Sequence, residues 1–149
     1  MNLSEFLVLA KRATYANTSA SSTTIEDGSI ELTFSVDDFS YRDRYLGSRA
    51  FLGEELVFQN GHAIWGMNYH GVSLTEKPSP AEIGTFLKSA LSKVSEENPY
   101  RGPFIHKFQD FEYHNQVEGT LESFSGHEEI NFQGHQVYYL HYHGGLLHK

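Results

Sequence analysis

Residues 51–71 read FLGEELVFQNGHAIWGMNYHG, and residues 124–144 read FSGHEEINFQGHQVYYLHYHG. Eight of the twenty-one aligned positions are identical, where roughly one or two would match by chance. The identical pairs are Phe51/Phe124, Gly53/Gly126, Glu55/Glu128, Gly61/Gly134, His62/His135, Tyr69/Tyr142, His70/His143 and Gly71/Gly144. This recurrence predicts that one structural unit occurs twice in the chain.

Each copy of the repeated stretch carries the signature of a β-hairpin. Asn60-Gly61 favours a tight two-residue turn, because both positions of such a turn need a positive φ, and Gly134 marks the same place in the second copy. Upstream, residues 29–36 alternate apolar and polar side chains, which indicates a strand with one buried face. Further strands are predicted at about 39–46, 54–59, 62–70, 104–108, 111–117, 120–132 (with an irregular break) and 136–143.

A helix precedes the strands of each copy. Apolar residues at helical spacing predict helices over residues 3–16 and about 80–95. Ser4 is the expected N-cap of the first helix and Asn17 its end. The Ser/Thr-rich residues 17–24 are expected to form a solvated loop.

These elements together predict an α+β fold. It consists of two diverged helix-plus-antiparallel-β-meander repeats related by a pseudo-twofold axis, with about two helices and eight strands. The 149 residues fit a single domain, 1–149, with repeat one at about 1–75 and repeat two at about 79–149.

Strand alternation sorts the last strand of each repeat into two faces. In the first copy Trp65, Met67 and Tyr69 share one face of the strand, and the second copy has apolar residues at the same positions. This face is expected to be core or cleft. The opposite face is rich in histidine: His62, His70, His135, His141 and His143.

Composition excludes several classes of protein. The net charge is −8, with 11 basic against 19 acidic residues, which argues against direct nucleic-acid binding and against binding to anionic membranes. The chain has no cysteine, so disulfide scaffolds and thiol chemistry are excluded, and no signal peptide is apparent. A cytoplasmic location is the default expectation.

Six residues are predicted to form a ligand site between the repeats. Trp65, Tyr69 and Tyr100 offer broad apolar contact with polar tips, and Arg101 offers a fork for an anionic group. Glu55 and Glu128 are the equivalent carboxylates of the two copies, suited to acid/base work or to a cationic ligand. The alternatives are ordinary sheet core for the aromatic residues and structural ion pairs for the charged ones.

No metal site and no cofactor are predicted. His141 and His143 form an H-x-H pair that would project two imidazoles from one face of a strand, but solvated or hydrogen-bonded histidines are the better interpretation. Lys11-Arg12, at the end of the first helix with Tyr15, is expected to complement the helix dipole. No phosphate-binding glycine loop is present.

Five motifs together are characteristic of a known family: Lys11–Ala16, Tyr45-Leu46-Gly47 with Gly53-Glu54-Glu55, Trp65–Tyr69, Pro99–Pro103 and Tyr142–Gly145. On these motifs the chain resembles a bacterial domain family of unknown function, whose members occur alone or C-terminal to an Xre-type helix-turn-helix domain. The pairing with regulators implies a sensing role in some members, although this sequence carries no helix-turn-helix segment. The resemblance assigns no catalytic residue.

Three functions are compatible with these observations. The first is a small-molecule binding or effector-sensing module with its cleft between the repeats. The second is an enzyme, a hydrolase or isomerase that uses glutamate or histidine groups with or without a divalent metal. The third is a homodimeric interaction module that pairs through exposed sheet edges.

Overall fold

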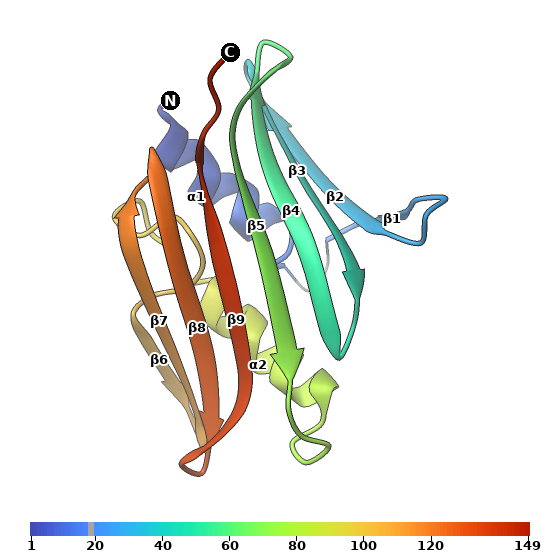
Figure 1. Cartoon of the computed structure of the whole chain (residues 1–149), viewed down its shortest axis with the longest axis vertical. Coiled ribbons are helices and arrows are strands. Elements are labelled where there is room, and N and C mark those ends of the chain that lie inside the picture. The colour runs from blue at the N-terminus through green and yellow to red at the C-terminus, as the bar shows by residue number, and fades with distance from the viewer. Residues whose placement is uncertain (18–19) are drawn as a thin grey trace.

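A single antiparallel sheet with both helices on one of its faces forms the molecule (Figure 1). A computed structural model describes residues 1–17 and 20–149. Within these residues the strand order is β1-β2-β3-β4-β5-β9-β8-β7-β6. The helices are α1 (Leu3–Ala13) and α2 (Pro80–Leu91). The strands are β1 (Thr23–Thr24), β2 (Ile30–Val36), β3 (Phe39–Gly47), β4 (Ala50–Gln59), β5 (His62–Ser73), β6 (Ile105–Phe108), β7 (Phe111–Thr120), β8 (Ser123–Phe132) and β9 (His135–Leu146).

The predicted α+β architecture with two helices is confirmed for the described residues, but the predicted number of strands is wrong. Nine strands are present, because Thr23 and Thr24 pair with Ile30 and Glu31 to form β1. This short strand lies in the segment that was expected to be a solvated loop. Its hydrogen bonds come from the edge of β2, a tertiary contact that local composition does not encode.

The hairpin turns lie where the sequence predicts them. Asn60 and Gly61 have φ of 49° and 78°, and they join β4 to β5 with Gln59 opposite His62. Gly134 has φ 81° in the corresponding turn between β8 and β9. The long strands β5 and β9 then pair along nine residues at the centre of the sheet. The two meanders therefore join into one continuous sheet.

Both helices begin with a capping box. The Asn2 side chain accepts from the Glu5 backbone N–H, and the Glu5 side chain accepts from the Asn2 N–H, so Asn2 rather than the expected Ser4 is the N-cap of α1. The helix ends at a Thr14 C-cap, three residues before the expected Asn17. Ser79 and Glu82 form the same box at α2. The cap position follows from this reciprocal pair, which Ser4 cannot form.

The helices cover the aromatic face of the sheet. Phe6 and Leu7 of α1 are fully buried, and each contributes about 2 kcal/mol of burial free energy. Trp65, Met67 and Tyr69 of β5 lie under the helices, whereas His70 beside them is exposed on the other face. The separation into an aromatic core face and an open histidine-rich face is therefore present in the structure.

The two meanders share several unusual local features. A one-residue irregularity falls between Val57 and Phe58 in β4 and at the matching place in β8. Gly53 and Gly126 lie directly beneath the hydroxyl groups of tyrosines on the neighbouring strands, where a Cβ atom would overlap those rings. The ring of a core tyrosine thus fills the space that each glycine leaves open.

Candidate functional site

Five charged side chains are buried together under the helices, and we call them the buried ion network. They are Lys11, Asp43, Glu55, Arg101 and Glu128, each no more than 3% exposed. They come from α1, from strands β3, β4 and β8, and from the segment that follows α2. Among the described residues these are the buried charges of the molecule. Charges in an apolar interior are costly unless they are paired, so the pairing of each one matters.

Lys11 and Glu55 form the first pair of this network. The Lys11 ammonium lies 2.8 Å from Glu55 Oε1 and donates to the Tyr100 carbonyl oxygen at 2.6 Å. The Tyr41 hydroxyl donates to the same Oε1 at 2.5 Å, so Glu55 Oε2 is left buried without a partner. Burial lowers the pKa of Lys11, and the Glu55 charge opposes that change. Lys11 therefore neutralises a core carboxylate in addition to lying near the end of the helix.

Arg101 and Glu128 form the second pair, and here every carboxylate oxygen is engaged. Arg101 Nη2 donates to Oε1 at 2.6 Å, and Nε donates to Oε2 at 3.3 Å. The Tyr138 hydroxyl donates to Oε1 at 2.8 Å, and the Tyr113 hydroxyl donates to Oε2. A bidentate pair with two further donors is a closed structural unit.

Asp43 is the member of the network without a cation of its own. It lies directly opposite Glu55 across β3 and β4, a position that brings the two Cβ atoms to about 5 Å. The Tyr69 hydroxyl donates to Oδ1 at 2.6 Å, and no described residue donates to Oδ2. Burial, followed by the charge of Glu55, raises the pKa of Asp43 to about 7. The carboxyl thus changes its charge close to neutral pH.

The second meander has asparagine at the corresponding place. Asn115 lies opposite Glu128 across β7 and β8, and its Oδ1 accepts from the Tyr142 hydroxyl at 2.8 Å. The Asn115 amide also donates to the Gly102 carbonyl at 3.0 Å. The two halves therefore differ in charge at this buried position, which is neutral and satisfied in one half and ionisable in the other.

A pocket of about 420 Å³ opens onto this ionisable position. It lies between strands β2–β5, helix α2 and the residues that follow α1. Its apolar lining includes Ile30, Leu32, Phe51, Leu87 and Leu91. Its polar lining includes Asp43, Tyr69, Arg101, Tyr15 and Lys88.

Tyr15 connects the pocket to the ion network. Its ring lies 5.3 Å from the Arg101 guanidinium and 5.5 Å from the Lys11 ammonium, as in cation–π pairs. Its hydroxyl is shut off from solvent and has no hydrogen-bond partner among the described residues. Burial, and then the charge of Glu55, raises the pKa of this hydroxyl well above 10, so it stays protonated. The Tyr15 hydroxyl is therefore a buried polar group that the described residues leave unsatisfied, while other atoms of the side chain line the pocket.

The six predicted site residues lie in one region but in two layers. Tyr69 and Arg101 line the pocket. Trp65, Glu55 and Glu128 are fully buried beneath it. Tyr100 is 6% exposed, and its ring packs against Phe124 with the ring centroids 4.6 Å apart. The contacts of these four buried residues agree with the alternative interpretations from the sequence. The two aromatic residues are part of the sheet core, and the two glutamates are in structural ion pairs.

Sequence reasoning missed Asp43 and gave Lys11 and Tyr15 only a helix-end role. One signal for Asp43 was available. In the predicted strand 39–46 it follows Phe39 and Tyr41 at a spacing of two residues, so its side chain belongs to the same, apolar face. A carboxylate at such a position is unusual and marks a polar site in the core. The contact between Lys11 and Glu55 joins residues 44 apart, which no local pattern reports.

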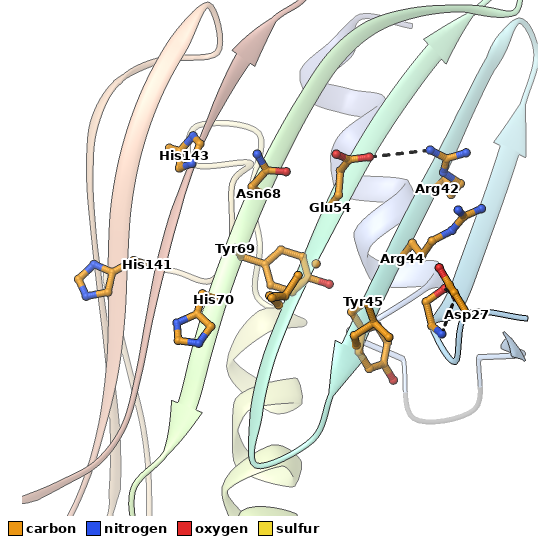
Figure 2. Close-up of a pocket in the computed structure, with 14 residues that line it drawn as sticks. Asp27, Arg42, Arg44, Tyr45, Glu54, Asn68, Tyr69, His70, His141 and His143 are labelled. Carbon is orange, nitrogen blue, oxygen red and sulfur yellow. Dashed lines mark hydrogen bonds and ion pairs between the residues drawn. The ribbon is translucent and has the colours of Figure 1, made fainter. Parts of the chain in front are cut away.

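A second hollow, of about 470 Å³, lies on the open face of the sheet. Figure 2 shows that Arg42 and Glu54 face each other as an ion pair at 3.9 Å, and that His70, His141 and His143 do not converge on a common point. Within residues 1–17 and 20–149, no three His, Cys, Asp or Glu side chains are grouped so that they could hold a metal ion. None of the five residues of the buried ion network lines this hollow, in contrast to the pocket under the helices.

The comparisons with known proteins place the chain in a family without assigning a function. Residues 43–147 match the family described as Domain of unknown function (DUF5680), and the chain belongs to this family. The matched range contains Asp43, Glu55, Arg101 and Glu128, and Lys11 lies outside it. No curated protein and no solved structure matches the chain. Across the part of the chain that the structure describes, no helix is long and apolar enough to cross a membrane.

Proposed function

We propose that this protein is a small-molecule binding module, and that its ligand occupies the pocket between α2 and strands β2–β5. The observation that carries the proposal is the pocket itself: about 420 Å³, lined by apolar side chains together with Asp43, Arg101 and Tyr15. Ligand sites are typically concave and largely apolar, with a few placed polar groups. The volume suits a small organic molecule with an apolar body and one polar end.

The difference between the two halves supports the choice of this location. We infer that the halves arose by duplication, because their glycines, turns and strand irregularities correspond. In one half the Glu128 carboxylate accepts four hydrogen bonds, so both of its oxygens are satisfied. In the other half both Asp43 and Glu55 keep an oxygen without a donor. Unsatisfied groups beside a pocket favour a role in binding over a role in stability.

An effector-sensing role is the specific form of this proposal. It rests on the resemblance to domains that occur behind Xre-type regulators, and on a pocket whose wall includes the segment after α1. A ligand there would touch both Tyr15 and Leu87, and so would bridge the first helix region and α2. Binding that bridges two elements stabilises their relative position, which is one way to transmit a signal.

Acid/base catalysis is a second candidate, supported by one observation. Asp43 and Glu55 are adjacent buried carboxyls with different surroundings, and the pKa of Asp43 is raised to about 7, first by burial and then by Glu55. Enzymes place general acids and bases in this range. Substrate turnover that Asp43→Asn abolishes would favour the enzyme over the sensor.

The test of the binding proposal uses Gly84, which lines the pocket from α2. A Cβ atom at Gly84 would have no other atom within 4 Å, so a larger side chain enters the pocket without displacing its neighbours. A fragment screen followed by backbone amide NMR shifts should give ligands that move the signals of Tyr15, Tyr69 and Leu87. Gly84→Leu should abolish these shifts.

Gly84→Ala and Thr85→Leu serve as controls for this experiment. The first keeps most of the pocket open, and the second places the same leucine on the adjacent, exposed helix position outside the pocket lining. Both variants should bind as the parent does. A screen in which no fragment moves these signals, or equal binding by Gly84→Leu, would contradict the proposal.

A further inference from the structure

The buried ion network contains more acids than bases. Its carboxylates are Asp43, Glu55 and Glu128, and its cations are Lys11 and Arg101. Each cation is already bonded to a glutamate, at 2.8 Å for Lys11 and at 2.6 Å for Arg101. When all five groups are ionised, the network therefore carries one net negative charge. Asp43 is the group left without a partner.

The surroundings of Asp43 supply no further positive charge. Glu55 of β4 adds a like charge, and Tyr69 of β5 contributes a neutral hydroxyl. The two cations that act on Asp43, Lys11 and Arg101, act from a distance, because neither has a hydrogen bond or ion pair with it. An unpaired carboxylate in the core must take up a proton or meet a cation from outside.

The pocket leads a ligand directly to this group. Asp43 lines it, and its Oδ2 has no described donor. Tyr15 and Tyr69 in the same wall present aromatic rings. A carboxylate oxygen and aromatic faces are together groups that recognise an ammonium.

We propose that the pocket selects an organic cation, a primary or secondary amine on an apolar body, whose ammonium group donates to Asp43 Oδ2 and lies near the aromatic rings of Tyr15 and Tyr69. The inference rests on the binding function proposed above and names the chemical class of its ligand. The apolar body lies against Leu32, Phe51 and Leu87. The incoming ammonium neutralises the one charge that the protein leaves unpaired.

An anionic ligand is disfavoured at Asp43 by the same inventory of charges. Two cations line the pocket: Arg101 has two N–H groups bonded to Glu128 and its charge is neutralised there, and Lys88 is an exposed residue of α2 whose charge is screened by solvent. An added carboxylate would be the fourth acid in a network with two bases. A neutral ligand would leave the charge of Asp43 as it is.

The test compares three probes of the same shape: 2-phenylethylamine, 2-phenylethanol and 3-phenylpropanoate. Dissociation constants are measured from amide shifts of the pocket residues in the full chain, at about pH 8.5 and about pH 5.5. At the higher pH the amine should bind roughly tenfold more tightly than the alcohol, the size of one charge-assisted hydrogen bond. Because Asp43 gains a proton as the pH falls through about 7, this advantage should disappear at the lower pH.

Asp43→Asn provides the control, since Asn115 fills the equivalent place next to a glutamate in the same fold. This variant should bind the amine and the alcohol alike at both pH values. Equal binding of amine and alcohol at pH 8.5, or an amine advantage that survives in Asp43→Asn, would overturn the inference while leaving the binding function intact. Tightest binding of the carboxylate would also overturn it. Failure of all three probes to move the pocket signals at saturation would count against both proposals.

Discussion

Replacing Asp43 by asparagine should stabilise the protein at high pH and have little effect at low pH. Burial, and then Glu55, raises the pKa of this carboxyl from an ordinary 3.8 to about 7 in the folded state. The folded chain therefore holds a proton between about pH 4 and pH 7 that the unfolded chain releases. Such a group reduces stability as the pH rises through this window, and the full cost is present above pH 7.

The size of the effect follows from the pKa change. Each pKa unit corresponds to about 1.4 kcal/mol, so the cost of ionised Asp43 reaches about 4 kcal/mol at most. Asparagine carries no charge and can still accept the Tyr69 hydroxyl through its Oδ1, as Asn115 accepts from Tyr142. The free energy of unfolding of Asp43→Asn should therefore rise relative to the parent by up to about 4 kcal/mol between pH 4 and pH 8.

Urea unfolding at several pH values measures this difference directly, because all other titrating groups are common to both proteins and cancel. Glu118→Gln is the matched control, since it removes one carboxylate from an exposed position of β7. Its stability relative to the parent should stay nearly constant across the range. A constant difference for Asp43→Asn as well would refute the argument that Asp43 is a buried, unpaired acid.

Four further single variants and one double variant test the network and the pocket wall. Lys11→Met should lower the unfolding free energy by about 3 kcal/mol, because it leaves Glu55 buried without its cation; the double variant with Glu55→Gln should recover much of this loss in the same urea assay. Tyr15→Phe should leave the melting temperature unchanged, since its hydroxyl has no partner. Tyr69→Phe should lower the free energy of unfolding by about 1 kcal/mol, because its hydrogen bond is lost. Equal effects of the two variants would contradict this assignment. Gly84→Ala should raise the stability by about 0.5–1 kcal/mol, because glycine weakens a helix interior and the added methyl meets no neighbour; a destabilised variant would show that the site is crowded.

Local patterns were sufficient for the elements and for the faces of the strands. The Asn60-Gly61 turn, the alternation in residues 29–36 and the helical spacing after Pro80 each depend on a few neighbouring residues. Such patterns act through steric preferences and through the two-residue period of a strand, so they can be read without a partner. For the same reason β1 escaped detection, since a two-residue strand exists only through its pairing with β2.

The candidate site was only partly accessible from the sequence. The repeated stretches pointed to Glu55 and Glu128 and to the aromatic face, and these residues do lie together beneath the pocket. They could not reveal which glutamate would receive Lys11 and which Arg101. The two residues of each pair are far apart in the sequence, and which cation meets which glutamate depends on where the helices cross the sheet.

The sequence alone thus predicted the helices and most of the strands, and which side of each last strand is apolar, because propensity and periodicity are local properties. Only the tertiary structure decided that β5 pairs with β9 in one continuous sheet, and that both helices share one of its faces. It also decided that Asp43 is the acid without a base. An unpaired charge depends on every ionisable group that the fold brings within reach, and the fold assembles those groups from distant parts of the chain.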